Sequence, residues 1–478
     1  MSHPLDLPGG FVWGAATAAF QIEGATSADG RTDSIWDTFC RVPGAVVGGD
    51  TGEVACDHYH RWPEDVALMA ELGLDAYRFS TAWPRIVPEP GRIEQRGLDF
   101  YSRLVDGLLE RGITPWLTLY HWDLPQWLED RGGWTSRDVV DHFTEYALAV
   151  HGALGDRVRH WTTLNEPWCS AFLGYAGGQH APGRQEPQAA VSALHHLLLA
   201  HGRVVQELRA VDPTAQLGIT LNFTVPDPVD PSDEADVRAA ALSDTMANRV
   251  FVEPVVLGAY PQDAIDALAA VGTALPVRDG DLEVIGTPID FLGVNYYTGT
   301  AVTGHAPEPT EVMPNGAPVE RPLSNPSVGV VDAYPVSRGL PRTAMDWEVQ
   351  PEGLERLLVR LHRDYTGPAG IPLYVTENGS AFDDEVGPDG EVDDVERTDY
   401  LVQHLAAVSD AVAAGADVRG YFAWSLLDNF EWAYGYEKRF GIVRVDFETQ
   451  ARTPKSSART YARAIATGAV PLGGTVRA

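Results

Sequence analysis

Lysine is almost missing from this chain. Among 478 residues only Lys438 and Lys455 occur, so arginine supplies nearly all of the basic side chains. A barrel enzyme that forms a Schiff base needs a desolvated lysine in its interior. Lys438 lies instead in the polar run Glu437-Lys438-Arg439, which is typical of a loop. We therefore do not expect Schiff-base chemistry.

Cysteine is equally scarce. Cys40, Cys56 and Cys169 are the only three, an odd number without the spacing of a metal site. Few cysteines and no disulfide pattern are typical of proteins kept in a reducing compartment. We expect an intracellular, cytoplasmic protein that holds no metal ion.

Positive charge is in short supply, and long apolar runs are missing. The chain has 35 basic and 67 acidic residues, which gives a net charge of −32. Such a charge repels nucleic acid and anionic membranes. No stretch reaches the roughly 20 apolar residues of a transmembrane helix, and residues 1–10 lack the basic segment of a secretion signal. We expect no nucleic-acid partner and no membrane partner.

Short apolar runs alternate with helical patterns along the whole chain. The predicted strands are Val12–Thr17, Ala76–Ser80, Thr114–Tyr120, Val158–Leu164, Leu217–Asn222, Phe291–Asn295, Leu373–Thr376 and Gly420–Trp424. Predicted helices between them include Trp62–Leu72, Leu98–Arg111, Val139–Leu154, Ala189–Val211 and Thr398–Ala414. Eight strands that alternate with helices predict a (β/α)8 TIM barrel of class α/β.

Long connections interrupt this alternation without dividing the chain. The segment Thr298–Pro351 is rich in proline and glycine, so we expect a long loop over one face rather than a second domain. Long βα loops over the carboxyl-terminal face usually shape the pocket of a barrel enzyme. Because no linker or repeat is visible, we expect residues 1–478 to form one domain.

Two glutamates stand in short polar frames at the ends of predicted strands. Glu166 lies in TLNEP (163–167) and Glu377 in YVTENG (374–379). Barrel enzymes keep their chemistry at strand ends. Cleavage of a glycosidic bond needs one carboxyl group that donates a proton and another that stays ionised beside the reacting carbon. For either glutamate alone, a buried carboxylate in a structural ion pair is the alternative.

Both frames, and the segments between them, resemble the family 1 glycoside hydrolases, the β-glucosidase family. The resemblance extends from Phe11 to about Tyr461. It implies a retaining β-glycosidase that needs neither a metal ion nor an organic cofactor. It also implies that Glu166 is the acid/base and Glu377 the nucleophile.

The resemblance implies further contacts to the sugar in the −1 subsite. The candidates in the first three quarters of the chain are Gln21, His121, Trp122, Asn165, Asn295 and Tyr297. An amide such as Gln21 can donate to one hydroxyl group and accept from its neighbour. Tyr297 and the supporting residue Arg78 would favour the ionised form of Glu377. For Arg78, an ordinary interior ion pair remains the alternative.

An aromatic segment with polar interruptions follows the last predicted strand. The resemblance places Trp424 under the sugar ring, Glu431 on O4 and O6, and Trp432 and Phe440 beside them. A stripe of rings can also be plain core, but Asp428, Asn429 and Glu431 argue against that. An ionised Glu431 would repel a phosphate group on O6.

Residues on the aglycone side match the family less closely. Trp168, Asn222 and Trp347 are the candidates there. The chain also has Ala19-Phe20 and Thr81 where relatives more often have Ser-Tyr and Ile. The preference among glucosides, galactosides and fucosides therefore stays open.

The sequence as a whole predicts a retaining β-glucosidase that acts on small β-glycosides, such as cellobiose or aryl and alkyl β-glucosides. Three alternatives remain at this stage: a 6-phospho-β-glycosidase, a catalytically silent sugar-binding protein on the same fold, and a transglycosylase. Lys438 could serve a phosphate pocket in the first of these. The sequence does not predict the oligomeric state.

Overall fold

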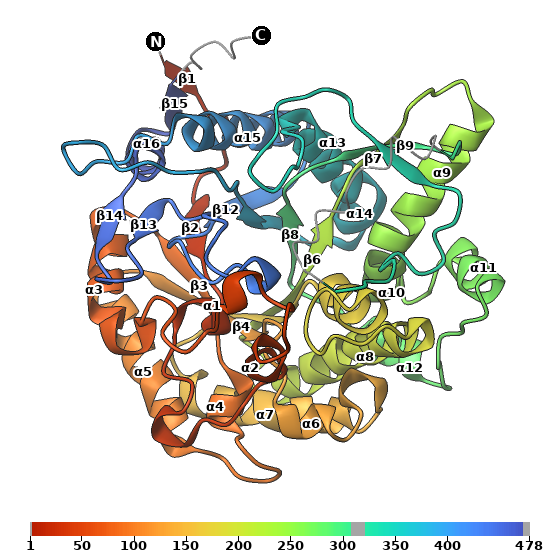
Figure 1. Cartoon of the computed structure of the whole chain (residues 1–478), viewed down its shortest axis with the longest axis horizontal. Coiled ribbons are helices and arrows are strands. Elements are labelled where there is room, and N and C mark those ends of the chain that lie inside the picture. Colours follow the sequence, from red (N-terminus) through yellow and green to blue (C-terminus); the bar gives the residue numbers. More distant parts are fainter. Residues whose placement is uncertain (1, 307–320, 472–478) are drawn as a thin grey trace.

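A closed barrel of eight parallel strands forms the centre of the computed structural model, which describes residues 2–306 and 321–471 (Figure 1). The barrel strands are β2 (Val12–Ala16), β3 (Ala76–Ser80), β4 (Thr114–Tyr120), β5 (His160–Asn165), β6 (Gln216–Phe223), β8 (Phe291–Tyr296), β11 (Leu373–Asn378) and β12 (Val418–Trp424). Each pairs in parallel with the next, and β12 pairs with β2, which closes the sheet. The predicted (β/α)8 barrel is confirmed.

Helices surround the barrel on all sides (Figure 1). The longer ones are α3 (His58–Glu71), α5 (Gln95–Glu110), α7 (Val139–Leu154), α8 (Pro187–Val211), α9 (Glu234–Asp244), α10 (Val250–Leu257), α11 (Gln262–Ala270), α13 (Pro351–Leu361), α15 (Val395–Ala413) and α16 (Ser456–Thr467). Short helices include α1 (Ala19–Ile22), α2 (Ile35–Cys40), α4 (Trp83–Ile86), α6 (Gln126–Glu129), α12 (Asp281–Ile285) and α14 (Gly367–Ala369). All five of the helices named from the sequence are present.

Aromatic rings fill part of the barrel interior. Trp116 of β4 contacts Phe291 and Tyr374, with ring centroids 4.8 Å apart in both cases, and it stacks on His160 at 4.3 Å. His160 and Phe291 are the first residues of β5 and β8. These rings therefore occupy the amino-terminal part of the interior, and the carboxyl ends of the strands are where barrel enzymes place their active sites.

The long connection between β8 and α13 is not purely a loop. It contains β9 (Thr300–Thr303) and β10 (Tyr334–Val336), which form a three-stranded sheet with β7 (Pro226–Pro228). The prediction of a loop over Thr298–Pro351 was thus wrong for these two short strands, which are too brief to show a clear alternation of apolar residues. Residues 307–320, which hold many of its prolines, lie outside the described residues.

The ends of the described chain pair with each other. β1 (Ser2–Pro4) and β15 (Ala469–Pro471) form a two-stranded antiparallel sheet at the upper edge of Figure 1. β13 (Val443–Val445) and β14 (Arg452–Pro454) form another small sheet. Within residues 2–306 and 321–471, no helix combines the length and the apolar character needed to cross a bilayer.

Candidate active site

The predicted site residues gather at the carboxyl ends of the barrel strands. Glu166 directly follows β5, His121 directly follows β4, and Gln21 lies in α1 just after β2. The strands themselves carry Arg78 (β3), Asn165 (β5), Asn295 (β8), Glu377 (β11) and Trp424 (β12). All of these side chains are buried. Eight residues from seven separate segments of the sequence thus meet at one end of the barrel.

A continuous chain of hydrogen bonds joins the two glutamates. The Arg78 guanidinium donates to Glu377 Oε1 at 2.5 Å and to Asn165 Oδ1 at 2.6 Å. The Asn295 amide donates to the same Asn165 oxygen at 3.1 Å and to Glu166 Oε1 at 2.8 Å. The structure therefore brings both predicted catalytic carboxyl groups into one buried polar network.

Arg78 also determines how the neighbouring amides are oriented. A guanidinium can only donate hydrogen bonds, so the carbonyl oxygen of Asn165 must face it. The Asn165 Nδ2 amide then faces His121 Nε2, 3.0 Å away. His121 Nε2 must accept this bond, which places the ring proton on Nδ1. Burial and the nearby charge of Arg78 hold the pKa of His121 well below its usual range, so the ring is neutral.

Glu377 has the partners that an ionised carboxylate needs. Tyr297 donates from its hydroxyl to Glu377 Oε2 at 2.7 Å, while Arg78 occupies Oε1. Burial raises the pKa of Glu377, and the charge of Arg78 and the hydrogen bonds from Tyr297 and Arg78 oppose this rise without cancelling it. A buried carboxyl group in contact with a guanidinium is the first in such a site to ionise.

Glu166 has weaker support for a negative charge. Burial raises the pKa of Glu166 most, and the negative charge of Glu377 raises it further. Its hydrogen-bond donors are the Asn295 amide and the Cys169 thiol, which lies 3.3 Å from Oε2. Glu166 therefore stays protonated to a higher pH than an ordinary carboxyl group, as a general acid must.

Besides Arg78 Nε, two buried polar atoms of the predicted site residues have no hydrogen-bond partner in the described part of the chain. These atoms are Gln21 Oε1 and His121 Nδ1. The Gln21 amide nitrogen is already held by Asn429 Oδ1 at 2.9 Å and by the Phe430 carbonyl at 2.8 Å. One acceptor and one donor are thus left for a ligand, which is the pair that a sugar diol can satisfy.

Aromatic rings form the walls beside these polar groups. Trp122 and Trp432 pack with ring centroids 4.6 Å apart, and His121 stacks on Trp424 at 5.7 Å. The Trp122 indole nitrogen donates to the main-chain carbonyl oxygen of Asn165 at 3.0 Å, which fixes the Trp122 ring. Phe440 contacts Tyr297 at 6.0 Å. Flat apolar faces beside hydrogen-bonding edges suit the C–H faces and hydroxyl edges of a sugar.

Glu431 differs electrostatically from the sequence-based expectation. Burial, Glu377 and Glu166 together raise the pKa of Glu431 to about 8. At pH 7 it is therefore mostly protonated, so its charge would repel a phosphate group less than expected. Lys438, which a phosphate pocket could use, is bound to Glu437 at 3.0 Å.

The three aglycone-side candidates surround the site less tightly. Trp347 packs against Tyr297 with centroids 5.5 Å apart and against Phe440 at 6.1 Å. Asn222 of β6 lies opposite Asn295 of β8 in the strand register. Trp168 immediately precedes the π-helical segment Cys169–Gly177 and packs on Phe172. All three are partly exposed, as expected at the mouth of a pocket.

Several residues that contact the site were missed from the sequence. Cys169 donates to Glu166, and Trp36 and His180 pack against the wall of tryptophans. For Asn429, which the sequence marked as a polar interruption, the contact with Gln21 was missed. Cys169 could have been found, because it follows Glu166 by three residues and so lies one helical turn away. Trp36 and His180 come from segments whose proximity depends on the tertiary fold.

Three of the predicted site residues have a left-handed backbone conformation. Their φ angles are 78° for Trp122, 47° for Glu166 and 51° for Trp432. This region is unfavourable for bulky residues and persists only where surrounding contacts enforce it. The left-handed turn at Glu166 redirects the chain from β5 into the following helical segment, which leaves the carboxyl group directed into the network.

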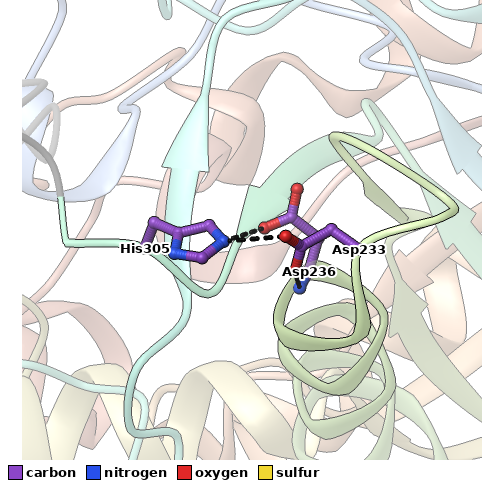
Figure 2. A group of neighbouring side chains, drawn as sticks. All are labelled: Asp233, Asp236 and His305. Carbon is purple, nitrogen blue, oxygen red and sulfur yellow. Dashed lines mark hydrogen bonds and ion pairs between the residues drawn. The ribbon is translucent and has the colours of Figure 1, made fainter.

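One group of acidic and histidine side chains in the described residues has metal-like spacing, and Figure 2 shows it. Asp233 and Asp236 of the α9 amino terminus face His305, with ligand atoms within 4.8 Å of one another. However, Asp233 Oδ1 accepts from two backbone N–H groups of α9, and Asp236 accepts from Thr303 and from backbone N–H groups. These carboxylates cap α9 and connect it to β9 through hydrogen bonds. They are not part of the site around Glu166 and Glu377.

Comparison with known families identifies the chain. Residues 3–469 match the family model of glycosyl hydrolase family 1. The chain belongs to this family. The family 1 assignment agrees with the resemblance seen in the two glutamate frames.

Individual relatives of this family 1 chain are similar over nearly their whole length. A solved structure of a psychrophilic β-glucosidase from Micrococcus antarcticus is 55% identical, has a TM-score of 0.94, and matches 97% of this chain and 98% of its own. A thermostable β-glucosidase B from Thermobispora bispora is 50% identical over 96% of this chain and 90% of its own length. A bifunctional β-D-glucosidase/β-D-fucosidase from Bifidobacterium breve is 47% identical over 96% of this chain and 98% of its own length.

Proposed function

We propose that this family 1 protein is a retaining β-glucosidase that releases terminal non-reducing β-D-glucosyl residues. The observation that carries the proposal is the asymmetric pair of buried carboxyl groups. Glu377 is held by a guanidinium and a phenol, whereas Glu166 is held by an amide and a thiol. The names of the relatives support the same activity, and the β-D-fucosidase among them supports a wider range that includes fucosides.

In the first step, the Glu377 carboxylate attacks the anomeric carbon while the glycosidic C–O bond breaks. Glu166 gives its proton to the departing oxygen, and the product is a covalent glycosyl-enzyme. Arg78 and Tyr297 stabilise the carboxylate before the attack without forming a bond to the sugar. Because they are fixed by the barrel strands, little reorganisation is needed as charge moves.

In the second step, Glu166 acts as a base. Esterified Glu377 carries no charge, so the second cause of the raised pKa of Glu166, after burial, disappears and Glu166 ionises more readily. It takes a proton from water, whose oxygen bonds to the anomeric carbon as the ester bond breaks. Two displacements at one carbon retain the β configuration.

Sugar recognition in the −1 subsite is assigned to the polar atoms and rings described above. Gln21 Oε1 and His121 Nδ1 are available to hydroxyl groups, and the Asn165 amide lies beside them for the 2-hydroxyl. Trp424 supplies the platform under the ring, and Glu431, when protonated, can both donate and accept at O4 and O6. Trp168, Asn222 and Trp347 would contact the leaving group.

The substrates we propose are small β-glycosides such as cellobiose and aryl or alkyl β-glucosides. Residues 1–478 would act as one catalytic domain. A cytoplasmic location belongs to the same proposal and is supported by the three free, buried cysteines.

A proton NMR time course with an aryl β-D-glucoside tests the reaction class. We expect the anomeric signal of β-glucose to appear first, followed by α-glucose through mutarotation. Early α-glucose would contradict Glu377 as the nucleophile. If no sugar is released, the same assay with a 6-phosphorylated glucoside and a binding measurement with glucose distinguish the remaining activities.

A further inference from the structure

The two carboxyl oxygens of Glu166 have chemically different partners. Oε1 accepts from the Asn295 amide at 2.8 Å, and Oε2 faces the Cys169 sulfur at 3.3 Å. Both partners are buried, with exposed fractions of 0% for Asn295 and 8% for Cys169. An acid/base residue carries its proton on one carboxyl oxygen and later loses it. The hydrogen-bond partner of each oxygen therefore influences which of the two oxygens carries the proton.

The orientation of Asn295 is fixed by its neighbours. Arg78 forces Asn165 to present its carbonyl oxygen, and Asn295 can bond to that oxygen only through its NH₂ group. The Asn295 carbonyl oxygen in turn accepts from the Thr376 hydroxyl at 2.8 Å. An amide NH₂ can only donate, so Asn295 favours an unprotonated Glu166 Oε1 and offers no acceptor to a proton on that oxygen. The transferable proton is therefore favoured on Oε2.

The partner at Oε2 has to tolerate both protonation states. A thiol can donate through S–H and accept weakly at sulfur, unlike an amide or a guanidinium. We propose that Cys169 is a positioning residue for the acid/base, whose thiol keeps the transferable proton of Glu166 on Oε2 and reverses its own hydrogen bond as that proton leaves and returns. This inference rests on the proposed double-displacement function.

The proton of Glu166 moves once in each step of the reaction. In the first step the O–H bond at Oε2 breaks, the proton bonds to the glycosidic oxygen, and the S–H of Cys169 rotates to donate to the new carboxylate. In the second step a water proton bonds to Oε2, and the S–H rotates away again. No bond to sulfur forms or breaks, and no oxidant or reductant is needed.

The other ionisable groups around Glu166 stay constant when only Cys169 is changed. These groups are Arg78 of β3, Glu377 of β11, Tyr297 directly after β8 and Glu431 in the segment after β12. His121, bonded to Asn165, is neutral. A change in the alkaline limb of the pH–rate profile can therefore be assigned to the bond at Oε2.

The test uses two substitutions with opposite expected effects on the full-length enzyme. Cys169→Val removes the donor without leaving space for water, so the pKa of Glu166 should rise and the alkaline limb of kcat/KM should move to higher pH. Cys169→Ser supplies a stronger donor, so the limb should move to lower pH. We expect each shift to be about half a pH unit, the effect of a hydrogen bond at the weak end of the usual range.

Cys40→Ser is the matched control. Cys40 has the same exposed fraction of 8% and lies in α2, without a hydrogen bond to Glu166. It should leave the limb unchanged. An alkyl β-glucoside, whose leaving oxygen needs protonation, should show the Cys169 effects more strongly than a nitrophenyl β-glucoside, which leaves with little acid assistance.

An infrared measurement gives a readout that does not depend on turnover. The S–H stretching band of Cys169, identified by its loss in Cys169→Ser, should shift as the pH is raised through the alkaline limb, while the bands of Cys40 and Cys56 stay fixed. If both Cys169 variants lower kcat/KM equally at every pH and the band does not move, the thiol is only a packing group. If Glu166→Ala itself keeps the wild-type profile, the proposed function is wrong, which is a distinguishable result.

Discussion

Arg78 has the widest influence of any single residue at the site. Its guanidinium contacts Glu377, orients Asn165, and through Asn165 determines the tautomer of His121 and the orientation of Asn295. It is fully buried. One residue that can only donate hydrogen bonds thus fixes the polarity of a network that reaches both carboxyl groups.

The raised pKa of Glu166 leads to a prediction about pH. Activity requires protonated Glu166, so kcat/KM should fall as the pH rises through this pKa, which lies above the range of ordinary carboxyl groups because of burial and Glu377. In Glu166→Gln the alkaline limb should disappear, and kcat/KM for an alkyl β-glucoside should fall about 10²–10⁴-fold. Initial rates over pH with alkyl and nitrophenyl glucosides check this. Retention of the wild-type limb in the variant would assign the acid to another residue.

For single residues, the sequence could predict which side chains belong to the site but not which of them are protonated. Glu166, Glu377 and Arg78 stand in recognisable frames, and the structure places them in contact with one network, although their catalytic roles stay predictions. The pKa of Glu431 could not be anticipated, because it depends on burial and on two carboxyl groups brought near it by the fold. The contact of Cys169 with one particular oxygen is likewise visible only in three dimensions.

Among the secondary-structure elements, the ends of β11 and β12 approach unusually closely. A Cβ atom built on Gly379, two residues after Glu377, would lie 1.7 Å from the carbonyl oxygen of Trp424. Asn378 Nδ2 donates to the Tyr296 carbonyl at 2.6 Å, and Asn378 Oδ1 accepts from the Tyr421 hydroxyl at 2.8 Å. The absence of a side chain at Gly379 thus allows the nucleophile strand and the strand bearing Trp424 to end side by side.

We predict that Gly379→Ala displaces Trp424 and weakens sugar binding. The added methyl group meets backbone rather than a flexible side chain, so we expect a loss of stability of about 1–3 kcal/mol together with a raised KM. Steady-state kinetics and thermal unfolding measure the two effects. Gly152→Ala in α7 is the control, because open space surrounds that position and an alanine there should not destabilise the fold.

Element boundaries were largely predictable, and the exceptions have physical causes. Each barrel strand begins and ends within two residues of its predicted position, because strands buried in a barrel are continuous apolar runs. Helix α3 begins four residues before the predicted Trp62. Proline favours the first turn of a helix, yet Pro63 is the sixth residue of α3. The strands β9 and β10 depend on pairing with each other and with β7, which no local pattern reveals.

Across the whole molecule, a buried ionic cluster ties together segments that follow the last two barrel strands. Its members are Lys455, Arg397, Arg439, Asp384, Asp394 and Asp428. Lys455 is fully buried, bonds to Asp384, and reaches Asp428 at 2.7 Å. Asp428 lies next to Asn429, the partner of Gln21. The one interior lysine therefore supports the loop that carries the sugar contacts.

Lys455→Met should destabilise the fold strongly. It leaves Asp384 and Asp428 with one buried cation fewer, and breaking a buried pair in this way costs about 3–5 kcal/mol. Lys438→Met provides the comparison with the other lysine, because its partner Glu437 is exposed and such a pair contributes about 0–1 kcal/mol. Thermal and denaturant unfolding of both variants check the difference. If Lys455→Met and Lys438→Met were equally stable, the remaining residues of the cluster would compensate for the loss of the buried Lys455 cation.

Closure of the barrel has a consequence for an enzyme cut into two pieces. A cut at the exposed residues 331–332 would leave β2 to β8 on one fragment and β11 and β12 on the other. The smaller fragment would still be hydrogen-bonded on both flanks, through β8–β11 and through β12–β2. A protease site inserted there should give a nicked enzyme that runs as two bands under denaturing conditions, yet elutes as one active species from a sizing column. In a closed sheet no strand is terminal, so the covalent chain can be interrupted without creating a loose end of the fold.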